Sequence, residues 1–124
     1  MREILFRAKK ESGDGWAEGL PVHDINGALT EFEVYKGFCH CGTVKIDPET
    51  IGQYTGFKDA NERKIFEGDI LCTDTDEENL LVRWDTDSAG FVLEGEGAEM
   101  SFDGYWGWQL EVIGNISDNP ELWR

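Results

Sequence analysis

Two cysteines and a histidine follow one another in the sequence as Cys39, His40 and Cys41. Thiolates and imidazoles are ligands that zinc prefers, and Cys72 could in principle supply a fourth ligand. Structural zinc sites usually separate paired cysteines by two residues, whereas one residue separates them here. On a strand, this spacing would place both sulfurs on the same face. A small metal-binding protein or enzyme using these residues stays open as an alternative, but we expect incidental cysteines and no metal or cofactor.

Carboxylates are the most abundant charged groups of the chain, and they gather in its second half. The 124 residues include 26 acidic and 11 basic side chains, for a formal net charge of −15. Residues 1–50 carry nine acids and six bases, and residues 51–124 carry seventeen acids and five bases. Binding to a phosphate backbone or an anionic membrane needs clustered lysine and arginine. We therefore expect neither direct nucleic-acid binding nor membrane docking.

The densest acidic segment begins at Asp74 and resembles the start of a calcium-binding loop. An EF-hand needs glycine at its sixth position and glutamate at its twelfth, where this sequence has Asn79 and Asp85. Paired carboxylates could also serve a glycosidase, but only in a sugar-binding cleft, and a small β fold offers little cleft. We predict a non-enzymatic protein whose acidic side chains form a partner-binding surface: Asp74, Asp76, Glu77, Glu78, Asp85, Asp87, Glu94 and Glu96.

The elements that would position these residues are short strands separated by turns. Apolar and polar residues alternate in several segments, which favours strands at residues 2–8, 29–38, 43–46, 80–85, 91–94 and 110–116. Pro21 makes residues 16–26 irregular, and Pro48 opens a single turn of helix. Residues 53–71 suit two strands around a turn near residues 59–63. With no amphipathic helix of three turns, the pattern predicts a mostly β fold, a small barrel or sandwich.

Three blocks of the sequence resemble one known family in the same order along the chain. They are residues 1–8, residues 53–71 and residues 110–122, and together they are similar to the YopX family of phage- and prophage-encoded proteins. Residues 67–71 and 81–85 also resemble the first hairpin of an SH3-like barrel. The resemblance implies a single mostly β domain over residues 1–124, with an SH3-like barrel core at 51–116. Residues 1–8 would join this barrel as a strand, and residues 16–49 would form a variable insertion.

One departure from the family pattern falls in the turn of the middle block. The family usually has an Asn-Gly turn there, whereas Asn61 is followed by Glu62. Glutamate is disfavoured at positive φ, so we expect a longer type I loop instead of a tight hairpin.

The resemblance brings no established activity and no catalytic residues, and it implies a phage-derived protein in the bacterial cytoplasm. Three cysteines and no signal-peptide pattern also favour a reducing compartment. We therefore favour a non-catalytic protein-interaction module, in particular an acidic modulator that occupies the basic groove of a host DNA-binding protein. A structural or assembly homo-oligomer and the metal protein or enzyme described above stay open as alternatives.

Overall fold

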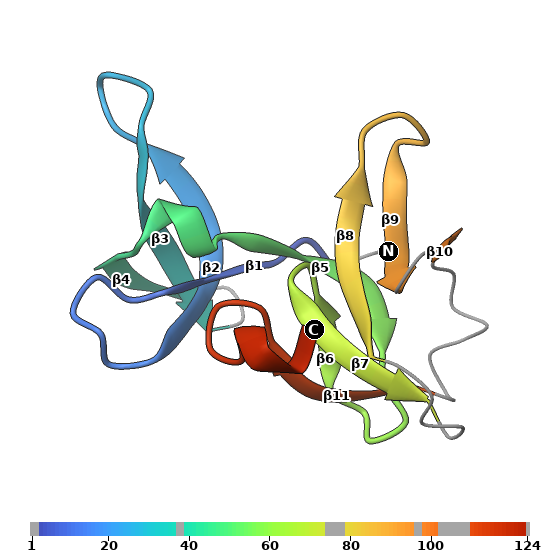
Figure 1. Cartoon of the computed structure of the whole chain (residues 1–124). Helices are drawn as coiled ribbons and strands as arrows, with labels where there is room; N and C mark the ends of the chain where they lie inside the picture. The colour runs from blue at the N-terminus through green and yellow to red at the C-terminus, as the bar shows by residue number, and fades with distance from the viewer. Residues whose placement is uncertain (1–2, 37–38, 74–78, 96–97, 102–109, 124) are drawn as a thin grey trace. The chain divides into compact units, whose positions relative to one another are not determined.

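The computed structural model describes residues 3–36, 39–73, 79–95, 98–101 and 110–123 (Figure 1). These residues form antiparallel strands and two short 3-10 helices, which confirms the prediction of a mostly β protein. Hydrogen bonds connect the described strands into one sheet of six strands and one sheet of five. No helix of the described residues is long and apolar enough to cross a membrane.

The strands fall into two compact units, Met1–Gln53 and Tyr54–Arg124. In the first unit, strands that follow one another in the sequence pair antiparallel and lie side by side (Figure 1). Its elements are β1 (Phe6–Lys9), β2 (Trp16–His23), β3 (Leu29–Lys36), β4 (Cys39–Lys45) and the 3-10 helix η1 (Pro48–Thr50). An isolated bridge between Lys10 and Ile46 joins the chain after β1 to the chain after β4.

The core of the first unit is small and is built around one aromatic ring. Phe32 is fully buried with Ala8, Ala17 and Ile46. Small residues are needed beside it because the strands approach closely. A β-carbon on Gly19 would lie 2.4 Å from the backbone oxygen of Glu33, which is shorter than any normal contact.

The prediction that residues 16–26 lack a long strand is wrong, because β2 runs through Pro21. β1 pairs with β2 from Trp16 to Gly19, and Pro21 pairs with Phe32 of β3. Beyond Gly19, β3 is therefore the only described strand beside β2. Proline lacks a backbone N–H, and a strand tolerates it where one side has no partner to receive that hydrogen bond.

The second unit holds the later strands and the larger core. β5 (Gly52–Lys58) enters it from the first unit, pairing with β1 through its first two residues and then with β6 (Lys64–Phe66). The other elements are β7 (Asp69–Thr73), β8 (Leu80–Asp85), β9 (Gly90–Gly95), β10 (Ala98–Ser101), β11 (Leu110–Asn115) and the 3-10 helix η3 (Pro120–Trp123). The predicted segment 80–85 is β8 itself, whereas β10 and η3 were not expected.

Hydrogen bonds connect the strands of the structure in two orders, β4-β3-β2-β1-β5-β6 and β10-β9-β8-β7-β11. The hydrophobic core cluster of the second unit takes its buried residues from β6, β7, β8, β9 and β11. They are Ile65, Leu71, Leu80, Val82, Leu93 and Leu110, with Phe57, Phe91 and Val112 packed around them. The described strands form no closed barrel, so the SH3-like barrel over residues 51–116 and the single-domain boundary stay predictions.

The turn between β5 and β6 spans residues 59–63, as predicted, and is longer than a two-residue hairpin. The backbone N–H of Glu62 donates to the carbonyl of Asp59, as in a β-turn. Glu62 nevertheless adopts a φ of 66°, so the expectation that this residue avoids positive φ is wrong. The side chain of Asp59 accepts hydrogen bonds from the N–H groups of Asn61 and Arg63, which holds Glu62 between them in this conformation.

Candidate functional site

Three of the eight predicted surface carboxylates lie among the described residues. Asp85 ends β8, Asp87 lies in the exposed turn after it, and Glu94 lies on β9. The other five lie outside the described residues: Asp74, Asp76, Glu77, Glu78 and Glu96.

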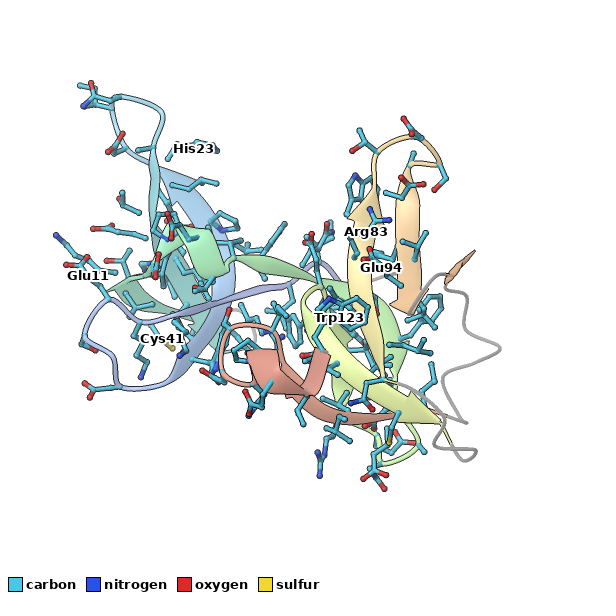
Figure 2. The ribbon with its side chains drawn as sticks, in the orientation of Figure 1. Glu11, His23, Cys41, Arg83, Glu94 and Trp123 are labelled. Atoms are coloured by element: carbon cyan, nitrogen blue, oxygen red, sulfur yellow. The ribbon has the colours of Figure 1, made fainter. Side chains whose placement is uncertain are left out.

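Glu94 forms an ion pair with Arg83, which lies on the adjacent strand β8. Arg83 on β8 donates from Nε to Oε2 of Glu94 at 2.6 Å, and the two side chains point toward each other across the strand pair (Figure 2). Leu81, two residues before Arg83, is the direct cross-strand partner of Glu94, so the ion pair is diagonal. Both side chains are about one third exposed, at 37% and 36%. The Arg83 charge offsets that of Glu94, which leaves Glu94 less able to attract a basic partner.

Asp85 is held as a carboxylate by the turn that follows it. The hydroxyl of Ser88 donates to Oδ2 of Asp85 at 2.7 Å, and the Ser88 backbone N–H donates to the same oxygen at 3.3 Å. The Ser88 hydroxyl is the main cause that lowers the pKa of Asp85, with smaller contributions from backbone N–H groups and from Arg83. Asp87 is exposed beside it. The end of this hairpin therefore presents the exposed Asp87 together with Asp85, whose ionised form the Ser88 hydroxyl stabilises.

Two further carboxylates of the second unit are structural and do not belong to any surface. Asp59 is 5% exposed, and its Oδ1 accepts from the N–H groups of Asn61 and Arg63 at 2.8 and 2.9 Å. Asp69 is 1% exposed and accepts from the N–H of Phe66 at 2.8 Å. Sequence reasoning did not single out either residue, although an aspartate two residues before an asparagine in a turn is a known signal for such side-chain bonding.

Other carboxylates of the second unit are exposed but were not in the predicted set. They are Glu62, Glu111, Asp118 and Glu121. The prediction concentrated on the dense run from residue 74 to 96, whereas β11 and the turn after β5 bring acids from outside that run. The sequence indicated these exposed carboxylates only through the overall acidic excess of residues 51–124.

Cys39, His40 and Cys41 all lie on β4 and are exposed. The pairing with β3 shifts register between Val34 and Tyr35, so that Cys41 is an extra residue in a bulge. The imidazole of His40 packs instead against the ring of Tyr35, with 5.1 Å between centroids. Within the part of the chain that the structure describes, no group of three or more histidine, cysteine, aspartate or glutamate side chains could hold a metal ion. Cys72 lies half-buried on β7 of the second unit.

The first unit also has an open pocket of ≈ 520 Å³ beside η1. Lys9, Lys10, Glu11 and Asp47 line it together with Gly13, Thr30, Ile46 and Pro48. Charges of both signs face this pocket, and Oδ1 of Asp47 already accepts from the N–H of Glu49. The lining therefore shows no preference for an anionic or a cationic ligand.

The fold is that of an antiparallel β protein built from two compact strand units, with its excess of carboxylates in the second. The chain matches the model of the family described as YopX protein over residues 5–124, and it belongs to the YopX family. The resemblance inferred from the three sequence blocks is thereby confirmed.

The chain is also similar to a solved structure, the crystal structure of protein EF1440 from Enterococcus faecalis. The two share 23% sequence identity and a TM-score of 0.67, and all of each chain is covered. At this identity the likeness shows a shared fold. No curated protein matches the chain.

Proposed function

We propose that this protein, of phage or prophage origin, is a non-catalytic interaction module that binds a basic surface of a host protein in the bacterial cytoplasm. The proposal rests on one observation: the excess of acidic residues falls in the second of the two compact units. Residues 54–124, the second unit, hold seventeen acids and five bases, while residues 1–53 hold nine acids and six bases. One unit therefore carries nearly all of the net charge.

The positions of the described carboxylates support this proposal. Among the carboxylates of the second unit that the structure describes, Asp59 and Asp69 are buried, and Glu94 is paired with Arg83. Asp85 and Asp87 at the end of the β8–β9 hairpin and Glu111 on β11 remain available to a partner. Carboxylates arranged in this way raise the association rate of a basic protein and favour it over acidic competitors.

A specific form of the proposal is that the carboxylates stand in for DNA phosphates. A protein that binds DNA through lysine and arginine would then release its DNA in favour of this chain. Neither an active-site chemistry nor a cofactor is needed for such an effect.

The experiment is capture of proteins from a lysate of the host bacterium at low and at high salt, followed by titration of the purified candidate. We expect a basic protein whose binding weakens steeply as salt rises, and which loses its DNA as this chain is added. If purified basic candidates show no salt-dependent binding, the proposal fails.

Matched variants locate the surface. Asp87→Asn with Glu111→Gln removes two exposed charges from the second unit, and Asp14→Asn with Glu49→Gln removes two from the first. The first pair should lower the association rate several-fold at low salt, while the second pair leaves it nearly unchanged. Equal effects would show that overall charge, not the second unit, attracts the partner.

A second candidate function is assembly of identical copies. β4 is the end strand in its hydrogen-bond order, and Cys39, His40 and Cys41 on it are exposed. The N–H of Glu11 donates to the carbonyl of Lys45 at one end of β4, and the rest of this strand edge can pair with the same edge of another copy. Light scattering decides this: a monomeric mass at all concentrations would remove the candidate.

A further inference from the structure

Two thiols face solvent on the same short stretch of an end strand. Cys39 and Cys41 of β4 are both exposed, and the thiol of Cys41 donates to the backbone carbonyl of Cys39 at 3.7 Å. The sulfur of Cys41 therefore lies back over the residue that bears the other thiol. Neither sulfur needs to leave a packed core to reach the other.

The backbone between the two thiols is not that of a regular strand. Two residues of an extended strand span about 6.6 Å, which is at the upper end of the range of about 4.4–6.8 Å that a disulfide bridges between Cα atoms. Cys41 is the extra residue of a bulge, and a bulge bends the strand away from this fully extended geometry.

The next residue adds local freedom. Gly42 has a φ of 122°, and nothing lies within 4 Å of the position that a β-carbon would take there. β4 also has β3 as its only neighbour in the strand order. A side chain that shifts beside Gly42 therefore meets no β-carbon there.

We propose that Cys39 and Cys41 form a redox-active dithiol that a low-molecular-weight disulfide oxidises to an intrachain disulfide. One cysteine thiolate attacks the small disulfide, forms a mixed disulfide and releases one small thiol. The second cysteine thiolate then attacks the protein sulfur of this mixed disulfide and releases the other small thiol. Overall, two protein thiols are oxidised, one small disulfide is reduced to two thiols, and no further oxidant is needed.

Proximity makes the second step fast. The neighbouring thiol is present at an effective concentration of at least the order of millimolar, because one residue links the two cysteines. The ring that closes is small, and strained exposed disulfides are the ones that cells reduce readily. In a reducing compartment the dithiol form dominates, and the disulfide forms when oxidised small thiols accumulate. This inference does not depend on the proposed function.

The test treats the reduced full-length protein with oxidised glutathione and follows the intact mass and the peptide that contains residues 39–41. A Cys72→Ser background removes the third thiol. We expect this peptide to lose two hydrogens without retaining glutathione, at a rate independent of protein concentration. Cys39→Ser and Cys41→Ser, each with one remaining thiol, should instead accumulate a stable glutathione adduct.

Two results would overturn the inference. One is a parent protein that carries glutathione on both cysteines or forms only crosslinked dimers. The other is a single-cysteine variant whose exposed thiol does not react. The ratio of the intrachain disulfide to the glutathione adduct is measured in the parent protein, which has both cysteines. The test therefore gives a result even if a single-cysteine variant folds poorly.

Discussion

Asp59 and Val112 are joined across 53 positions of sequence by one hydrogen bond. The backbone N–H of Val112 on β11 donates to Oδ2 of Asp59 at 3.0 Å, while Oδ1 of the same carboxylate closes the turn between β5 and β6. The N–H of Ala60 also donates to the carbonyl of Leu110. A single buried carboxylate therefore sets the turn and attaches it to the last strand of the second unit.

Replacing Asp59 with alanine should destabilise the protein by about 3 kcal/mol or more, since three backbone N–H groups lose a charged acceptor. Asp59→Asn keeps one acceptor oxygen and should cost roughly half as much. Urea unfolding followed by tryptophan fluorescence measures both values. Asp87→Ala, at an exposed aspartate of the same unit, is the control and should change stability little. Equal losses for Asp59→Ala and Asp87→Ala would contradict this account.

Glycine should stabilise the turn at Glu62, whose φ is 66°. A side chain in this conformation costs roughly 1–2 kcal/mol that glycine avoids, although glycine also makes the unfolded chain more flexible. We expect Glu62→Gly to be more stable than Glu62→Ala by about 1 kcal/mol. Comparing these two variants cancels the effect of removing a negative charge. A more stable alanine variant would show that the turn has changed its conformation.

Ala89 offers an independent case, with a φ of 53° in the turn between β8 and β9. Ala89→Gly should raise the melting temperature by a few degrees for the same reason. A melting temperature below that of the parent protein would contradict the prediction.

Alanine at Gly19 should destabilise the first unit by about 3 kcal/mol, because its β-carbon would meet the backbone oxygen of Glu33. A backbone atom of a paired strand cannot move aside as a flexible side chain can. Gly90→Ala is the matched control, since its β-carbon would lie 3.9 Å from the nearest atom outside its chain neighbours. Amide hydrogen exchange of β2 and β3 locates the loss. If Gly19→Ala proves neutral, the strands are not as closely packed as described.

Protonation of Asp85 should lower the free energy of unfolding of the second unit in the acid pH range. Its folded pKa lies below the ordinary value of 3.8, so the folded state favours the ionised carboxylate. This stabilisation is complete well above pH 3.8 and is lost as the pH falls through the lower folded pKa. The stability difference between the parent protein and Asp85→Asn should therefore shrink on acidification. Ser88→Ala removes the main donor and should reproduce part of this change; a difference that stays constant with pH would exclude the mechanism.

The positions of most strands follow from the sequence alone, because the alternation of apolar and polar residues is a local property. In the segment from Leu80 to Asp85, every second residue from Leu80 onward is apolar, and β8 has these bounds. The helical turn at Pro48 and the turn at residues 59–63 were likewise readable from proline and from polar turn residues. Membership of the YopX family also followed from the sequence, through three ordered blocks.

What the sequence could not show is which distant groups meet, because that depends on how the strands pair. Pro21 stands in a strand because β1 begins only at Phe6, opposite Gly19, and does not extend to pair with Pro21. Cys41 leaves the regular alternation because β3 and β4 shift register. Glu94 was expected at a free acidic surface, yet Arg83 from the adjacent strand pairs with it. The composition gives the number of carboxylates but not which of them are buried. Asp59 and Asp69 become buried, and Asp87 stays exposed, only when the strands pack. Local pattern thus determined the strands and the family, and tertiary pairing decided which charged groups remain at the surface.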